Sequence, residues 1–163
     1  MVMNSPTTER LFTLRVEDLM NSDLVTIQEY ETMCTAARKL RENHINGAPV
    51  VDQDGKCVGV VTSSDFVAWE GGRCDSHVST HSADEPWTVE RQNDDLVSSH
   101  MSRNVQTIPK QCMLLTAAAR LCEYGIHRLV VVDDDHRPVG MISSLDFVAA
   151  IVGIGEDYYG FSR

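Results

Sequence analysis

Two short stretches of the chain place a hydroxyl three residues before a carboxylate. They read TSSD at 62–65 and SSLD at 143–146, and each precedes an amphipathic run. This pattern is typical of a capped helix start, where a hydroxyl bonds the first N–H groups and the acid favours the helix dipole. The same groups could bind a ligand, because a carboxylate accepts hydrogen bonds from a vicinal diol such as a ribose while N–H groups contact a phosphate. The candidate residues are Thr62, Asp65, Ser143 and Asp146.

The chain repeats itself at an offset of 81 residues. Residues 20–68 lie without a gap over 101–149, with 20 identities in 49 positions. Chance similarity in one register gives only a few identities, so the sequence indicates a duplicated structural unit. Both pairs of candidate residues therefore occupy equivalent places.

Each unit is predicted to run strand, helix, strand, strand, helix. A short extended run covers 24–27, and apolar residues recur at helical spacing over 32–44. Two β-branched runs follow, separated by the turn signal QDGK, and the second copy repeats this order. The fold class is therefore α+β, with a small three-stranded sheet and two helices in each unit. A unit of about 55 residues buries a modest fraction of its surface, so we expect the two to pack sheet to sheet about a pseudo-twofold axis.

His127 and Arg128 stand directly before an apolar strand of the second copy. The planar guanidinium of Arg binds phosphate in a bidentate manner, and His adds a donor or a second positive charge. Charged residues are also common in a solvated turn between a helix and a strand. The first copy has Asn46 and Gly47 here, so the fold does not require charge in both copies, and this favours a functional role.

The overall composition predicts a cytoplasmic protein that binds neither nucleic acid nor membrane. Lys and Arg total 14 against 24 acids, a net charge of −10, and a surface of this sign repels nucleic acid and anionic lipid. No apolar run approaches the length of a membrane span, and the N-terminus has no signal-peptide pattern. Five scattered cysteines without a CxxC motif are predicted to be reduced thiols.

Metal binding and catalysis have little support in the sequence. Cys74, His77 and His81 form the one cluster with metal-like spacing, but it lies in a polar stretch and lacks the paired pattern of a zinc site. The sequence has no GxSxG, HExxH or P-loop motif. We expect no metal, no required cofactor and no enzymatic activity.

The two units resemble cystathionine β-synthase (CBS) domains, and the chain resembles a tandem CBS pair, or Bateman module. The matching segments are INGAPVVDQDGKCVGVVTSSDF and IHRLVVVDDDHRPVGMISSLDF, with the preceding helices and the leading VEDLM and VSSHM. By this resemblance the chain divides into an N-terminal arm (1–15), repeat 1 (16–70), a linker (71–95), repeat 2 (96–152) and a C-terminal tail (153–163).

The resemblance implies a regulatory module that binds an adenosine nucleotide (AMP, ADP, ATP or S-adenosylmethionine) in clefts between the repeats. It would signal to a partner protein by a conformational change, most simply as a homodimer. The alternative is a dimeric interaction scaffold without a physiological nucleotide. The ribose-binding acid falls on Asp65 and Asp146, with hydroxyl partners at Thr62 and Ser143. The adenine-facing start of a strand falls on Ile45, Asn46 and Gly47, and on Ile126, His127 and Arg128.

The segment IHRLVVVD is similar to the phosphate-contacting segment of the regulatory γ subunits of AMP-activated protein kinase. By that analogy His127 and Arg128 reach the phosphate of the nucleotide whose ribose Asp65 holds. The Asp146 site would lack such a pair, so we expect a phosphate-competent site at Asp65 and a weaker or neutral-ligand site at Asp146.

Overall fold

The computed structural model describes residues 12–76 and 95–159, and the side chains of 12–71 and 95–152. The first half contains η1 (Val16–Asp18), β1 (Ile27–Gln28), α2 (Met33–Glu42), β2 (Gly47–Val51), β3 (Cys57–Thr62) and α3 (Ser63–Ser76). The second half contains α4 (Val97–His100), β4 (Thr107–Pro109), α5 (Leu114–Tyr124), β5 (Arg128–Val132), β6 (Pro138–Ser143) and α6 (Ser144–Tyr159).

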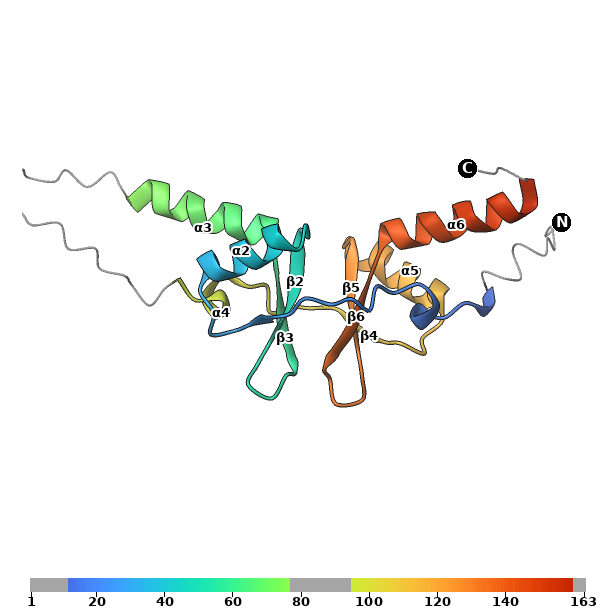
Figure 1. Cartoon of the computed structure of the whole chain (residues 1–163), viewed down its shortest axis with the longest axis horizontal. Coiled ribbons are helices and arrows are strands. Elements are labelled where there is room, and N and C mark those ends of the chain that lie inside the picture. The colour runs from blue at the N-terminus through green and yellow to red at the C-terminus, as the bar shows by residue number, and fades with distance from the viewer. Residues whose placement is uncertain (1–11, 77–94, 160–163) are drawn as a thin grey trace, which may run out of the picture. The chain divides into compact units, whose positions relative to one another are not determined.

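Both repeats have the predicted order of elements, and the α+β class with two three-stranded sheets is confirmed. In each sheet the first strand pairs parallel to the second, which pairs antiparallel with the third. Figure 1 shows α3 leaving the β2–β3 hairpin, and α6 leaving the β5–β6 hairpin, at the end opposite the hairpin turn. The packing of one sheet against the other stays a prediction.

Helix α2 is shorter than the predicted 32–44 range. Thr32 caps its start by accepting the backbone N–H of Thr35 at 3.2 Å. The helix ends at Glu42, and His44 then adopts a φ of 54°. Gly125 holds the equivalent place after α5, with a φ of 62°. A left-handed residue is a common helix terminator, so the two repeats end this helix with the same geometry and different residues.

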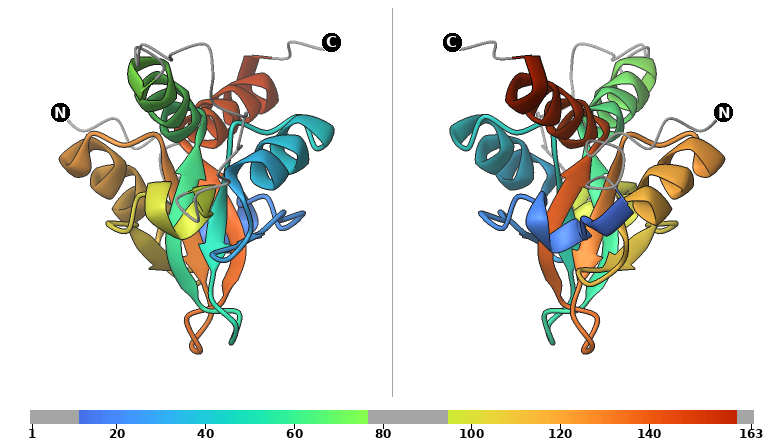
Figure 2. Two further views of the ribbon diagram at one scale, coloured as in Figure 1. Left: turned by 90° about the vertical axis from the view of Figure 1, so that its left-hand side faces the viewer. Right: turned by 90° about the vertical axis from the view of Figure 1, so that its right-hand side faces the viewer.

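The compact units in space differ from the repeats in sequence. One unit comprises residues 25–104, and the other comprises residues up to 24 together with those from 105 onward. The segment before β1 therefore packs on repeat 2, where Asn21 bridges Met141, and the segment before β4 packs on repeat 1, where Ser102 bridges Val60. Figure 2 shows the blue η1 among the orange elements of repeat 2, and the yellow α4 among the green elements of repeat 1.

Each unit has its own apolar core, to which the exchanged segment contributes. Val97 and Met101 are buried in the core of the first unit, and Val16 is buried in that of the second. The first core also contains Ile27, Met33, Ala36, Leu40, Ala48, Val50, Val61 and Trp69. The second also contains Ile108, Leu114, Ala117, Leu121, Leu129, Val131 and Ile142. Since these exchanged residues are part of the cores, the segments before β1 and β4 are held in fixed places.

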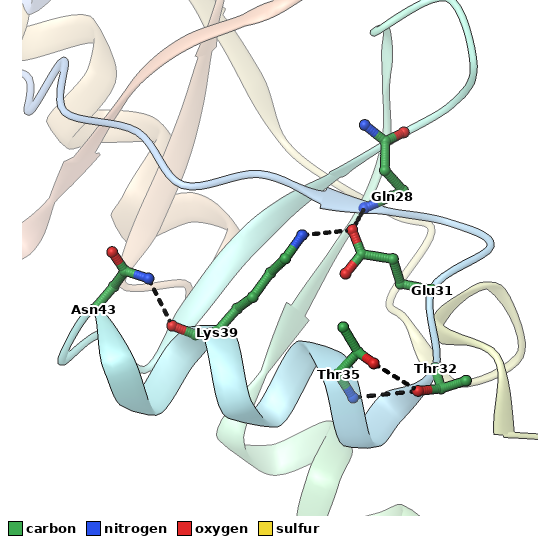
Figure 3. Close-up of polar contacts among 6 residues, drawn as sticks. All are labelled: Gln28, Glu31, Thr32, Thr35, Lys39 and Asn43. Carbon is green, nitrogen blue, oxygen red and sulfur yellow. Dashed lines mark hydrogen bonds and ion pairs between the residues drawn. The ribbon is translucent and has the colours of Figure 1, made fainter.

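An ion pair fixes α2 to the end of β1 in the first unit (Figure 3). Glu31 Oε1 accepts the Nζ of Lys39 at 2.6 Å and the backbone N–H of Gln28 at 3.1 Å. The other oxygen of Glu31 is buried and has no hydrogen-bond partner within residues 12–76 and 95–159. In the second repeat the equivalent residues are Cys112 and Arg120, and Arg120 donates instead to the carbonyl of Thr107. The two units thus hold this helix by different contacts.

The described cysteines Cys34, Cys57, Cys112 and Cys122 are free thiols. Within 12–76 and 95–159, no helix combines the length and the apolar composition that crossing a bilayer demands.

Candidate functional site

The two predicted acids lie in the first turn of α3 and of α6, each bound to the hydroxyl residue three positions earlier. Asp65 Oδ2 accepts the backbone N–H of Thr62 at 2.7 Å and the Thr62 hydroxyl at 2.8 Å. Asp146 Oδ2 accepts the same two groups of Ser143 at 2.6 and 2.7 Å. The structure therefore brings together both predicted pairs.

The direction of these hydrogen bonds differs from the capping that the sequence suggested. The hydroxyls of Thr62 and Ser143 donate to the carboxylates and do not accept an N–H from the helix. The carboxylate accepts the N–H of the residue before the helix, as in half of a capping box. The Oδ2 oxygen of each acid is thereby held in place, and these bonds do not involve its Oδ1 oxygen. Both acids are half-buried.

The predicted strand starts lie directly beside these acids. Gly47 pairs with Thr62 across β2 and β3, and the backbone N–H of Ser63 donates to the Asn46 carbonyl at 3.0 Å. In the second unit Arg128 pairs with Ser143, and the Ser144 N–H donates to the His127 carbonyl at 3.0 Å. Each unit thus joins a strand start to the turn that carries the acid.

The side chains at these strand starts divide into apolar and solvent-facing groups. Ile45 and Ile126 are half-buried and pack against the cores of their units. The side chains of Asn46, His127 and Arg128 are exposed. Among the described residues, no hydrogen bond or ion pair engages the Arg128 guanidinium, so its charge is free for an anionic ligand.

The strand start of repeat 1 leaves little room for a side chain at Gly47, which pairs with Thr62. A Cβ on Gly47 would lie 3.0 Å from the Val61 carbonyl oxygen and 3.2 Å from the methyl carbon of Thr62. In the second repeat Arg128 faces Ser143, which has no methyl group. The larger residue at the strand start therefore occurs with the smaller hydroxyl residue.

Sequence reasoning missed Ser102 in the first unit. Its hydroxyl lies 3.4 Å from Asp65 Oδ1, the oxygen that Thr62 leaves unused. Ser102 is 37 residues from Asp65 in sequence. Only the repeat offset, which aligns it with Asn21, marks the position at all, so no local pattern predicts this contact.

The candidate metal cluster of the sequence analysis falls outside the described side chains. The side chain of Cys74, together with His77 and His81, lies outside the described residues. Across the part of the chain that the structure describes, no group of three or more His, Cys, Asp or Glu side chains is placed to hold a metal ion.

Two β-α-β-β-α units, each with an oriented carboxylate beside a strand start, define a tandem-repeat α+β module. The chain belongs to the CBS domain family, with matches at residues 16–72 and 96–153. The family suggested by the repeated segments is thus confirmed.

Several known proteins share this fold. The CBS domain pair of protein MJ0100, in complex with 5′-methylthioadenosine and S-adenosyl-L-methionine, is 27% identical with a TM-score of 0.68; the match covers 86% of this chain and 97% of that one. CBSX2 in complex with AMP is 24% identical with a TM-score of 0.68, covering 86% and 98%. An L-aspartate semialdehyde sulfurtransferase of Methanocaldococcus jannaschii is 28% identical over 131 residues, which are 80% of this chain and 22% of that protein. The chain thus spans about a fifth of that relative's length.

Proposed function

We propose that this chain is a regulatory module that binds an adenosine nucleotide and passes the bound state to a partner by a conformational change. The proposed ligand-binding residues are the two aspartates that would bind the sugar, their hydroxyl partners, and the residues at the strand starts beside them. They are Ile45, Asn46, Gly47, Thr62, Asp65, Ile126, His127, Arg128, Ser143 and Asp146.

The observation that carries the proposal is that one oxygen of the carboxylate in each unit, Oδ2, accepts two hydrogen bonds, and these bonds leave Oδ1 unused. Thr62 occupies Oδ2 of Asp65 with two donors, which fixes the carboxylate before any ligand arrives. A preoriented acceptor suits a vicinal diol, because two neighbouring hydroxyls need acceptors at a fixed place. The Asp146 carboxylate has the same arrangement.

The comparisons support an adenosine-type ligand and a role without catalysis. The MJ0100 pair, a 27% identical module, binds two adenosyl compounds. The sulfurtransferase relative is mostly outside the region of similarity, so its activity is no guide to this chain. We propose that the chain is not an enzyme and needs no cofactor, the nucleotide being a regulatory ligand.

We propose that the two sites are unequal. His127 and Arg128 would supply positive charge to the phosphate of the nucleotide held at Asp65, whereas Asn46 and Gly47 offer none at the other site. The tight space at Gly47 fits this difference, because a Cβ there would lie 3.0 Å from the Val61 carbonyl oxygen and 3.2 Å from the Thr62 methyl carbon. The Asp146 site is then suited to a neutral adenosine compound.

The test is a panel of AMP, ADP, ATP, S-adenosylmethionine and 5′-methylthioadenosine, measured by thermal unfolding and calorimetry. A ligand at a hundredfold excess over its Kd stabilises the folded protein by about 2.7 kcal/mol. Asp65→Ala should abolish binding at the first site, and Arg128→Ala should weaken AMP more than 5′-methylthioadenosine, because only AMP has a phosphate.

Asp52→Ala is the matched control. Asp52 also accepts two backbone N–H groups, those of Asp54 and Lys56, each at 2.9 Å, but at the turn end of the same hairpin. It should lose similar local stability and keep nucleotide affinity. Absence of any shift across the panel would overturn the sensor proposal and favour the interaction scaffold.

We further propose that the module is a cytoplasmic homodimer that contacts a second, unidentified protein. Helix α6 exposes an apolar face, so a second copy has apolar surface to cover. These exposed side chains are Leu145, Val148, Ile151 and Val152. The sequence ranges 1–15, 16–70, 71–95, 96–152 and 153–163 remain our proposal for arm, repeats, linker and tail.

A further inference from the structure

The acceptor capacity of Asp65 is not exhausted by Thr62. A carboxylate has about four lone-pair positions, and Oδ2 uses two of them for the N–H and hydroxyl of Thr62. Among the described residues, the one hydrogen-bond contact of Oδ1 is the Ser102 hydroxyl at 3.4 Å. This is longer than the roughly 3.0 Å upper limit of a good O–H···O bond. Oδ1 is therefore available to a ligand, and the Ser102 hydroxyl lies next to it.

The place of Ser102 is set by the backbone. Its carbonyl accepts the N–H of Val60 at 3.0 Å, and its own N–H donates to the Val60 carbonyl at 2.9 Å. Gly59 permits this approach, because a Cβ there would lie 3.0 Å from the Ser102 carbonyl oxygen. One residue further on, the Arg103 guanidinium donates to the Ser98 carbonyl at 2.9 Å. The segment is thus held on both sides of the serine.

The second unit repeats the backbone arrangement with a different side chain. Asn21 exchanges two backbone hydrogen bonds with Met141, at 2.9 and 3.0 Å. Its side-chain Oδ1 accepts the N–H of Asp23 at 2.9 Å. Within the described ranges, no hydrogen bond joins the Asn21 side chain to Asp146. Among the described residues, a second hydroxyl beside the acid, in addition to that of the residue three positions earlier, is therefore found only at Asp65.

We infer that Ser102 is a sugar-contacting residue that makes the Asp65 site selective for an intact vicinal diol. This inference rests on the proposed function. One sugar hydroxyl donates to Asp65 Oδ1, and its neighbour donates to the Ser102 oxygen, while the Ser102 hydroxyl donates to Asp65. Such a chain of hydrogen bonds uses both hydroxyls of a ribose. A deoxyribose leaves one protein group without its partner and binds less tightly.

The experiment compares AMP with 2′-deoxy-AMP and 3′-deoxy-AMP by calorimetry. Every protein carries Asp146→Ala, so that only the Asp65 site reports. Ser102→Ala should weaken AMP by about three- to tenfold, the range expected for one net hydrogen bond. It should leave one of the two deoxy compounds nearly unaffected, because that compound already lacks the hydroxyl that Ser102 contacts. The ratio of the AMP affinity to the affinity for that deoxy compound should therefore decrease by the same three- to tenfold factor.

Two further variants separate this role from a structural one. Ser102→Thr keeps the hydroxyl and should keep the preference. Ser99→Ala removes an exposed serine hydroxyl from the same segment and should change none of the three affinities. If Ser102→Ala weakens AMP and both deoxy compounds equally, or leaves the preference unchanged, the inference is wrong while the proposed function stands. If neither AMP nor 5′-methylthioadenosine binds the protein without substitutions, the proposed function fails and this inference fails with it.

Discussion

Replacing Gly59 by alanine should disturb the Asp65 site without substituting any of the proposed ligand-contacting residues. The added Cβ would lie 2.7 Å from Met101 Sδ, 3.2 Å from Met101 Cγ and 3.0 Å from the Ser102 carbonyl oxygen. The thioether is unbranched and can rotate away. The carbonyl cannot, because it is part of the paired backbone bonds between Ser102 and Val60. The substitution must therefore displace the segment that carries Ser102.

The stability loss follows from these contacts. Overpacking a filled site costs about 1–3 kcal/mol, and alanine recovers about 0.4–1 kcal/mol by restricting the unfolded chain. The two effects leave a net loss of up to about 2.5 kcal/mol, which lowers Tm by up to roughly 10 °C for a chain of this size. Because Ser102 moves from Asp65, the variant should also lose part of its preference for AMP over the deoxy nucleotides.

Two other glycines are matched controls. In Gly140→Ala the new Cβ would lie 2.8 Å from Met20 Sδ and 3.0 Å from the Asn21 carbonyl oxygen. This variant should lose similar stability and keep the sugar preference of the Asp65 site. Gly71, in α3, has nothing within 4 Å of a Cβ, so alanine there should stabilise the protein by up to about 1 kcal/mol. A Gly59→Ala protein with unchanged Tm and unchanged sugar preference would refute the reasoning.

Two further predictions concern the helices. In a double-mutant cycle measured by urea unfolding, Glu31→Gln and Lys39→Met should show a coupling free energy of about 1 kcal/mol. The value is modest because the 2.6 Å pair is only partly shielded from water, with 36% of the Lys39 side chain exposed. Additive losses of stability would contradict this prediction. Leu145→Asp should convert the proposed dimer to a monomer in light scattering, because it puts a charge beside the exposed Val148 on α6. Leu115→Asp, on exposed α5 surface, should leave the dimer intact, and an unchanged mass for Leu145→Asp would exclude this face as the interface.

Local patterns were sufficient to predict most secondary structure. The helical spacing of Met33, Ala36 and Leu40 matches the buried face of α2, and the β-branched runs became the hairpin strands. Their repetition at one offset made the prediction stronger than either copy alone. The short β1 was placed only approximately, because two paired residues leave almost no periodic signal.

The exchange of the leading segments could not be predicted from such patterns. Val97 and Val16 are each buried in the core of the other repeat's fold, a pairing between residues distant in sequence. Local propensity and spacing have no information on such pairings. The same limit hid Ser102, whereas the hydroxyl and acid of the helix start, only three residues apart, were found at once.

The exchange has a consequence for how a bound ligand could be sensed. Ser102 lies three residues before Val105, where the chain passes from one compact unit to the other. A ligand that engages the Ser102 hydroxyl thus binds within the first unit, near one of the two places where the chain passes between units. A ligand shifts a conformational equilibrium only by its different affinity for two states. Because Ser102 and Asp65 lie in the same compact unit, a diol that contacts both would signal only if one conformational state alters the distance between them.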